Sequence, residues 1–264
     1  MRVLVFGKTG QVATELQRFD GVTALPRAEA DLSDPAACAG IIAGSDADVI
    51  INAAAYTGVD TAETDSNMAF RVNSETPTAM AEAAAKRALP FLHISTDYVF
   101  DGTGSRGVYG ASKLAGEQGV RAASGAHAIV RTSWVVSAQG NNFVKTMLRL
   151  GAERDALNIV ADQIGGPTCA RDIASALMKM AGQLHSDPSK SGTSHFAGAP
   201  DVSWADFARE IFAQSGITCD VNDIPSSAYP TPAARPANSR LDCTQINTVF
   251  DINRPDWRVG LAQI

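Results

Sequence analysis

The sequence predicts an α/β fold in which helices cover both faces of a parallel sheet. Short, almost wholly apolar runs alternate with alanine-rich stretches of helical composition through the first half of the chain. Buried parallel strands have such continuous apolar runs because both of their faces are covered. The chain has 264 residues, of which 45% are hydrophobic, and this allows one large domain with a smaller appendage.

The first half of the chain supplies the strands of this sheet. Pro35 favours a helix start because its missing N–H costs nothing at the first helical position. The predicted strands are Val3–Phe6, Val22–Leu25, Asp48–Asn52, Phe91–Ser95 and Ala128–Arg131. The predicted helices between them are Gln11–Arg18, one that starts at Asp34-Pro35, Pro77–Arg87 and Ala111–Arg121.

After Trp134 the alternation loosens, and segments rich in Gly and Pro separate the helices. Three further helices are predicted there, at Phe143–Leu150, Ala170–Gly182 and Trp204–Gln214. We expect residues 1–133 to form the sheet domain, with residues 168–184 packed on it. Residues 134–167 and 185–264 are expected to form a smaller region over the carboxyl edge of the sheet.

Charge and cysteine usage exclude several classes of protein. The net charge is −6 and the sequence has no basic stripe, which argues against a nucleic-acid partner. The four cysteines lie far apart without a CxxC pair, so we expect reduced thiols and no zinc site. The apolar run at Val3–Phe6 is too short for a signal peptide or a membrane span, so a cytoplasmic protein is expected.

The first motif is the segment Phe6–Val12, FGKTGQV, which follows the first strand. A glycine turn at this place lets backbone N–H groups approach a phosphate at a helix N-terminus. Only Gly7 and Gly10 fit the dinucleotide fingerprint, so an ordinary tight turn is an equal alternative.

Tyr109 and Lys113 form the second motif. Residues four apart share one face of a helix, so both side chains can point into one site. A neighbouring ammonium favours the phenolate and would lower the pKa of Tyr109, which makes the phenol a competent proton donor or acceptor. The alternative is a solvated helix face.

Two more motifs end predicted strands. The small residues within Ile51–Tyr56 leave room for a flat ligand at the sheet edge, although ordinary close packing explains this motif better when it is taken alone. The hydroxyl of Thr96 can stabilise negative charge that develops on a substrate carbonyl, or it belongs to a simple turn. All four motifs fall at carboxyl ends of strands, and this shared edge favours a functional site over four coincidences.

The residues at these positions resemble the extended short-chain dehydrogenase/reductases, and within them the dTDP-4-dehydrorhamnose reductase family. The resemblance implies a Rossmann-like, doubly wound sheet with a smaller C-terminal substrate-binding region. The matching runs cover essentially the whole chain and are FGKTGQVATELQR (6–18), NAAAYTGVDTAE (52–63), STDYVFDGTG (95–104), YGASKLAGE (109–117), RTSW (131–134), NNFVKTMLRL (141–150), ADQIGGPT (161–168) and RPANSRLDC (235–243).

The resemblance implies an oxidoreductase that transfers hydride from NADPH or NADH to the 4-keto group of dTDP-4-dehydro-L-rhamnose, giving dTDP-L-rhamnose. The implied catalytic residues are Thr96, Tyr109 and Lys113. Tyr109 and Lys113 would also contact the cofactor, together with Gly7, Gly10, Gln11, Val12, Asp31, Leu32, Ala55, Tyr56 and Thr57. The implied substrate contacts are Thr96, Asp97 and Trp134, although Trp134 is also explained as a core aromatic.

Arginine placement suggests two further contacts. After the second strand, NAD enzymes often carry an acidic residue, but this sequence has Arg27 there. The missing acid and the guanidinium, which can bind a 2′-phosphate, favour NADPH. Arg235 is expected to reach the diphosphate of the substrate. For both residues, plain surface solvation is the alternative.

The resemblance also implies a homodimer with magnesium, and Glu15 stands where one metal carboxylate would be. Since an acid such as Glu15 is more often simply a helix-surface residue, the metal is left open.

Two other classes of function remain as alternatives. One is another sugar-nucleotide enzyme of the same fold, a reductase, an epimerase or a dehydratase, because Asp97 beside Thr96 is a feature of dehydratases. The other is a non-catalytic binding module, which the presence of both Tyr109 and Lys113 disfavours.

The stretch between the DGTG and YGASK segments is shorter than the family pattern, with the join near Arg106–Gly107. Either a segment is truly deleted there, or a mobile loop has been left out of the sequence, and we favour the second explanation.

Overall fold

The computed structural model of the chain describes residues 1–100 and 107–264, and a six-stranded sheet dominates it. Every pairing in this sheet is parallel, in the order β10-β5-β4-β3-β1-β2. The strands are β1 (Val3–Phe6), β2 (Val22–Leu25), β3 (Val49–Asn52), β4 (Phe91–Thr96), β5 (His127–Thr132) and β10 (Gly192–His195).

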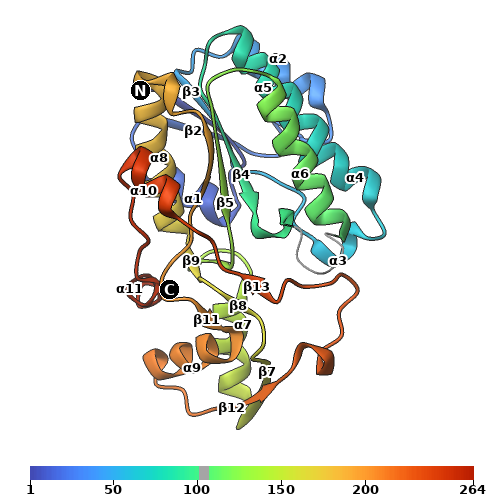
Figure 1. The fold of residues 1–264 in the computed structure, drawn as a ribbon, viewed down its shortest axis with the longest axis vertical. Coiled ribbons are helices and arrows are strands. Elements are labelled where there is room, and N and C mark those ends of the chain that lie inside the picture. The colour runs from blue at the N-terminus through green and yellow to red at the C-terminus, as the bar shows by residue number, and fades with distance from the viewer. Residues whose placement is uncertain (101–106) are drawn as a thin grey trace.

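Helices cover both faces of the sheet, as predicted (Figure 1). One face packs against α2 (Pro35–Gly44), α5 (Thr76–Lys86) and α6 (Gly107–Ala122). The other packs against α1 (Gln11–Leu16), α8 (Ala170–Ser186) and α10 (Thr244–Phe250). Central strands buried on both sides explain the continuous apolar runs, and the predicted doubly wound fold is confirmed.

The predicted strands of the first half agree with the structure to within one residue at either end. Strand β10 was not predicted, because its sequence Gly192–His195 is polar and glycine-containing, as an edge strand tolerates. Its pairing with β5 places part of the segment 185–264 in the large sheet and not in the smaller region. Helix α6 begins at Gly107, earlier than predicted, so Tyr109 lies inside it.

The smaller region lies below the carboxyl edge of the sheet in Figure 1 and has its own aromatic core. Its helices are α7 (Phe143–Glu153), α9 (Trp204–Ser215) and α11 (Trp257–Leu261). Its strands form three small sheets: β7 (Ala156–Val160) with β12 (Asp220–Ile224), β6 (Val135–Val136) with β9 (Thr168–Cys169), and β8 (Ile164–Gly165) with β11 (Val202–Ser203) and β13 (Asn238–Ser239).

Short helical segments complete the chain. A continuous helical run joins α4 (Ser66–Phe70), the π-helical turn η1 (Arg71–Glu75) and α5. The others are α3 (Val59–Ala62) and the 3₁₀ turns η2 (Asp97–Val99), η3 (Pro188–Lys190) and η4 (Ser226–Ala228). None of these short elements was predicted, since each has too few residues to show a periodic pattern.

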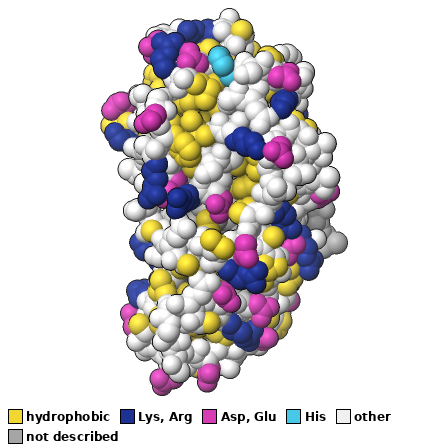
Figure 2. Space-filling view, turned by 90° about the vertical axis from the view of Figure 1, so that its left-hand side faces the viewer, with side chains coloured by type: hydrophobic (Ala, Val, Ile, Leu, Met, Phe, Trp, Pro, Cys, Tyr) yellow, Lys and Arg dark blue, Asp and Glu magenta, His cyan; other side chains and the backbone are white. Residues whose placement is uncertain are grey.

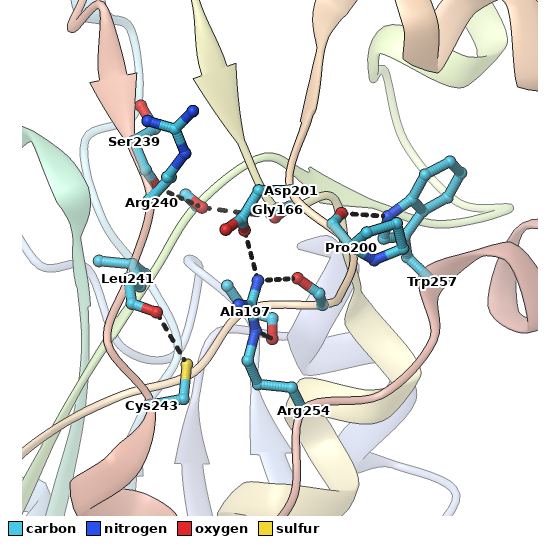
Figure 3. Close-up of polar contacts among 12 residues, drawn as sticks. Gly166, Ala197, Pro200, Asp201, Ser239, Arg240, Leu241, Cys243, Arg254 and Trp257 are labelled. Carbon is cyan, nitrogen blue, oxygen red and sulfur yellow. Dashed lines mark hydrogen bonds and ion pairs between the residues drawn. The ribbon is translucent and has the colours of Figure 1, made fainter.

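Arg254 fastens the C-terminal segment to the turn that follows β10 (Figure 3). Its guanidinium donates to the carbonyls of Ala197 and Gly198 and pairs with Asp201. Nearby, Trp257 Nε1 donates to the Pro200 carbonyl at 2.7 Å. These bonds tie the segment that leads into α11 to the turn after β10.

Figure 2 shows the charged and apolar side chains on one face of the molecule. Charges of both signs are interspersed there, and apolar side chains gather over the half with the large sheet. All four cysteines are free, as predicted. Among the described helices, none combines the length and the hydropathy needed to cross a membrane. The join predicted near Arg106–Gly107 lies outside the described residues.

Candidate active site

A large cavity lies where the carboxyl edge of the sheet meets the smaller region. Its volume is about 1410 Å³. The pocket of a single small ligand measures roughly 300–1,000 Å³, so this cavity has room for two ligands side by side. It is the position where open parallel sheets bind ligands, and both halves of the chain contribute to its lining.

The glycine turn after β1 forms one wall of the cavity. Gly7 has a φ of +107°, and a Cβ there would lie 3.3 Å from Ala53 and Ala54, so the position requires glycine. Gly10, Gln11 and Val12 line the cavity itself. The structure thus places Gly7 behind the turn, as a residue that shapes it.

The side chain of Gln11 ties this turn to the smaller region. Its Oε1 accepts hydrogen bonds from Ser137 Oγ at 2.9 Å and from Asn142 Nδ2 at 3.0 Å. Asn142 also caps α7, because its Oδ1 accepts from Lys145 N. The two walls of the cavity are therefore connected through one amide.

The segment after β3 forms the next part of the wall. Ala55 and Thr57 line the cavity, whereas the backbone of Tyr56 is held from behind by Asn73. Asn73 Oδ1 accepts from Tyr56 N at 2.9 Å, and its Nδ2 donates to Tyr56 O at 3.0 Å and to Ser112 Oγ at 3.1 Å. Asn73 thereby fixes the distance between this segment and α6.

Tyr109 and Lys113 lie one turn apart on α6, and both line the cavity, as predicted from their spacing. Lys113 is almost fully buried, with 2% of its surface exposed. Its Nζ donates to the Ile94 carbonyl at 2.7 Å and lies 3.3 Å from His93 Nε2. Burial lowers the pKa of Lys113 to about 8, against the opposing effect of Glu117.

The predicted lowering of the Tyr109 pKa is wrong for this structure. Burial raises the pKa of Tyr109 to about 12, and a hydrogen bond with Thr96 offsets this only partly. Lys113 Nζ is turned to Ile94 and His93, and Lys113 is not among the groups that shift the pKa of Tyr109. Tyr109 is therefore a protonated phenol at neutral pH, which is the form that can donate a proton.

Thr96 and Asp97 stand together at the carboxyl end of β4. Thr96 Oγ1 donates to Asp97 Oδ1 at 3.0 Å and accepts from Tyr98 N at 3.3 Å. Burial raises the pKa of Asp97, while hydrogen bonds with Ser239 and Thr96 oppose that effect. Asp97 Oδ2 is buried and has no hydrogen-bond partner, so it is available to a group that enters the cavity.

Trp134 lies at the boundary between the cavity and the aromatic core of the smaller region. Its ring lines the cavity and also stacks on Trp204, with ring centroids 3.5 Å apart and planes inclined by 12°. The backbone of Trp134 has a φ of +48°, and Trp204, on which its ring stacks, is the first residue of α9.

Arg235 lines the cavity, but an acid already holds it. Its Nη2 donates to Asp60 Oδ2 at 2.7 Å, and Asp60 Oδ1 accepts from Ala233 N at 3.0 Å. These bonds lower the pKa of Asp60. Asp60 belongs to α3, so this contact pins the segment between η4 and β13 to the other half of the molecule, as Figure 1 shows.

Besides Gly7 and Tyr56, three more predicted cofactor residues lie outside the cavity lining. Leu32 is buried beneath the sheet, and its carbonyl accepts from Thr76 Oγ1 at 2.6 Å. Arg27 is 80% exposed and pairs with Asp31 across 3.3 Å. A hydrogen bond from Ser33 and the pairing with Arg27 lower the pKa of Asp31. The structure places Arg27 and Asp31 side by side at the surface.

Glu15, the predicted metal carboxylate, is buried and pairs with Arg18 at 3.0 Å. Within residues 1–100 and 107–264, no group of three His, Cys, Asp or Glu side chains is placed to hold a metal ion. Magnesium at Glu15 therefore has no support in this structure.

Sequence reasoning missed a buried ionic network behind the cavity. Glu117 is fully buried and accepts from Arg131 at 2.6 Å and 2.8 Å, from Arg121 at 2.8 Å and from Ser95 Oγ at 2.6 Å. Four residues after Lys113 on α6, Glu117 lies on the same helix face, and this spacing was the signal that could have found it.

Comparisons with known proteins agree with this geometry. A family model described as RmlD substrate binding domain matches residues 1–264. A protein of Sinorhizobium fredii named dTDP-4-dehydrorhamnose reductase is 45% identical, over all of this chain and 96% of its own length. A protein of the same name from Salmonella typhimurium is 39% identical over all of this chain and 97% of its own length. The first alignment runs over 285 positions against the 264 residues of this chain, so the relative has residues that this chain lacks.

Solved structures are similar over the same length. The crystal structure of dTDP-4-dehydrorhamnose reductase from Bacillus anthracis in complex with NADP has a TM-score of 0.90 at 32% identity, covering 98% of this chain and 96% of that one. The corresponding structure from Clostridium acetobutylicum has a TM-score of 0.91 at 34% identity, covering 100% and 98%. A UDP-glucose 4-epimerase reaches 0.81 at 12% identity, which shows the shared fold alone.

Proposed function

The chain belongs to the RmlD substrate binding domain family of dTDP-4-dehydrorhamnose reductases, and on that premise we propose that it reduces the 4-keto group of dTDP-4-dehydro-L-rhamnose to give dTDP-L-rhamnose. It is an NAD(P)-dependent oxidoreductase. The observation that carries the proposal is the meeting of Thr96, Tyr109 and Lys113 in one cavity large enough for a cofactor and a sugar nucleotide.

The cavity fits a dinucleotide along the wall formed by the first and third strands. Gly7 keeps the turn close to Ala53 and Ala54, and these small side chains leave the wall flat. Backbone N–H groups at Gly10–Val12 would meet the pyrophosphate, and Ala55–Thr57 would line the path to the nicotinamide. When bound, the reduced nicotinamide supplies the hydride.

The chain itself supplies the proton and holds the carbonyl oxygen. Thr96 and Tyr109 hydrogen-bond each other, so a keto oxygen that enters between them can accept from the Tyr109 hydroxyl, and from Thr96 once its single proton turns away from Asp97 Oδ1. Tyr109 then donates its proton to that oxygen as negative charge develops there. Lys113, one turn along α6, would hold the ribose and orient the cofactor beside the carbonyl.

Three groups are proposed to bind the sugar nucleotide. The free Oδ2 of Asp97 can accept from a sugar hydroxyl, since it lies buried at the carboxyl end of β4 without a partner. The exposed edge of Trp134 offers an apolar surface to the sugar or the base. Arg235 is proposed to contact the diphosphate, for which it would exchange its bond with Asp60.

NADPH is the proposed cofactor, with Arg27 beside the 2′-phosphate and with Asp31 and Leu32 near the adenine. The exposure of Arg27 supports this role, because its guanidinium can turn from Asp31 to a phosphate. Residues 1–133 with 168–184 would form the dinucleotide-binding domain, joined by β10, and the remainder the substrate-binding region. A homodimer remains a prediction.

The function is tested by following NADPH oxidation with a panel of 4-keto sugar nucleotides. We expect turnover with dTDP-4-dehydro-L-rhamnose and much slower turnover with UDP- or GDP-linked 4-keto sugars, and weaker binding of NADH than of NADPH. Turnover of the other sugars at the same kcat/KM would contradict the assignment of substrate. No NADPH oxidation with any of them would contradict the assignment of the reaction.

A further inference from the structure

A chain of polar contacts leads from the backbone of the β3 end to Lys113. Ala54 N donates to Asn52 Oδ1 at 3.2 Å, Asn52 Nδ2 lies 3.2 Å from His93 Nδ1, and His93 Nε2 lies 3.3 Å from Lys113 Nζ. Asn52 and His93 are fully buried. The proposed mechanism uses neither of them.

The first contact in this chain fixes the direction of all the others. A backbone N–H can only donate, so the group that faces Ala54 must be the amide oxygen of Asn52. The amide nitrogen of Asn52 then faces His93, and this nitrogen can also only donate. His93 Nδ1 must therefore be the unprotonated acceptor nitrogen of the ring.

The last contact of this hydrogen-bond series is the one between His93 and Lys113. A neutral imidazole with an unprotonated Nδ1 carries its proton on Nε2, and this N–H points at Lys113 Nζ. An ammonium at Nζ would place two donors against each other 3.3 Å apart. A neutral amine accepts from His93 and still donates to the Ile94 carbonyl at 2.7 Å.

We propose that His93 is a positioning residue that acts through Lys113: held by Asn52, its Nε2–H opposes protonation of the lysine and so sets the pH at which the lysine gains its charge. The inference rests on the proposed role of Lys113 in the cofactor site. The contacts end at a backbone N–H, so they cannot conduct a proton to solvent. Their effect is to fix which nitrogen of His93 carries the proton.

Other charged groups act on Lys113 from the neighbouring elements. Glu117, on α6, favours the ammonium, but it is already shared by Arg131 from β5 and by Arg121. Asp97 of η2 and Tyr109 of α6 line the same cavity. Burial raises the pKa of both side chains and so favours their neutral forms. Burial lowers the pKa of His93, which keeps its ring neutral as the argument requires.

Two substitutions change the donors and acceptors in this series of contacts in different ways. Asn52→Asp replaces the donor that faces His93 by an acceptor, so the ring proton moves to Nδ1 and Nε2 becomes an acceptor for an ammonium. His93→Leu removes the opposing N–H altogether. Both should raise the pKa of Lys113, and Ser194→Ala, a buried polar residue of β10 in the same sheet, is the matched control.

The readout is the dissociation constant of NADPH, measured by fluorescence titration across pH. In the unaltered protein we expect binding to weaken with an inflection near pH 8, where burial places the pKa of Lys113. Each variant should move the inflection upward by about one pH unit, a tenfold change in the protonation equilibrium, whereas Ser194→Ala should leave it in place.

The double variant distinguishes an effect that acts through the His93 tautomer from the direct electrostatic effect of the new carboxylate at position 52. If His93 transmits the effect, Asn52→Asp should move the inflection much less in the His93→Leu background. An unmoved inflection in either folded single variant, or an equal shift with and without His93, would overturn the inference. The titration needs no sugar nucleotide, so a failure of the proposed reaction would be seen separately, in the substrate panel.

Discussion

In the proposed reaction Tyr109 donates the proton, and burial keeps its phenol protonated. The pKa near 12 means that the phenol is intact throughout the neutral range. Its bond to Thr96 aims the hydroxyl at the place where a carbonyl oxygen would sit. Reduction of a carbonyl needs such a proton donor, and the phenol of Tyr109 would supply it in the proposed reaction.

Replacing this donor tests the assignment at the level of one atom. We expect Tyr109→Phe to lower kcat by on the order of a hundredfold or more, since a general acid is lost, while the dissociation constant of NADPH stays unchanged. Steady-state kinetics with fluorescence titration measures both quantities. Tyr98→Phe is the matched control, because it removes a phenol from the ring that packs edge-on against Tyr109 at 5.4 Å. A fully active Tyr109→Phe variant would refute the role of Tyr109.

Single residues differed in how far the sequence could predict them. Tyr109 and Lys113 were found because helical spacing alone puts them on one face. The pKa direction of Tyr109 was missed, because it depends on burial and on where Lys113 Nζ points, which spacing does not contain. His93 and Asn52 lie in apolar strand runs, and only the register of β3 beside β4 brings them together.

Helix α6 is the element that carries the proposed chemistry, and close packing holds it in place. A Cβ at Gly116 would lie 2.0 Å from the Asn73 carbonyl, so only glycine lets α6 approach the π-helical turn η1 this closely. On another face of the helix, Glu117 joins α6 to β4 through Ser95 and to β5 through Arg131. These contacts fix the height of Lys113 and Tyr109 above the sheet.

The Glu117 network makes a prediction about stability. Burial alone would raise the pKa of Glu117, but Arg131, Ser95 and Arg121 together lower it below its usual value. A carboxylate with a lowered folded pKa stabilises the protein above its unfolded pKa, and this contribution is lost as pH falls through the folded value. Glu117→Gln should therefore cost about 3–5 kcal/mol at pH 7, because it leaves Arg131 without its buried partner.

Urea denaturation at neutral pH and again near pH 4 measures this cost. The deficit of Glu117→Gln should shrink at the lower pH, where the unaltered protein also begins to lose the carboxylate. Glu153→Gln is the matched control, since Arg149 and Glu153 form an exposed pair at the same helical spacing and should contribute less than about 1 kcal/mol. Equal deficits for the two variants, or a deficit that does not change with pH, would contradict this account of α6.

Elements were predictable where the periodic pattern was long. Strands β1–β5 and helices α5 and α8 follow from apolar runs and helix-forming residues. The turn η1 was not predicted, because its sequence Arg71–Glu75 is ordinary helix sequence and does not distinguish π from α geometry. Strand β10 gave no apolar signal, so its place at the sheet edge could be seen only in the fold.

At the scale of the whole molecule, the site exists only because the two halves meet. Gln11 is bonded to Asn142, and Asp60 to Arg235, so both sides of the cavity are fastened across the boundary. The sequence predicted a smaller region over the carboxyl edge but not these contacts, which join residues more than 100 positions apart. We propose that this cavity directs hydride from the cofactor to a keto sugar.

The transfer of an isotopic label tests that claim most directly. NADPH deuterated at the transferable C4 position is incubated with dTDP-4-dehydro-L-rhamnose, and the product is analysed by NMR and mass spectrometry. The account predicts dTDP-L-rhamnose with one deuterium, located at C4 of the sugar, and one NADPH consumed for each product. A product without deuterium, or a sugar that changes without consumption of NADPH, would contradict it.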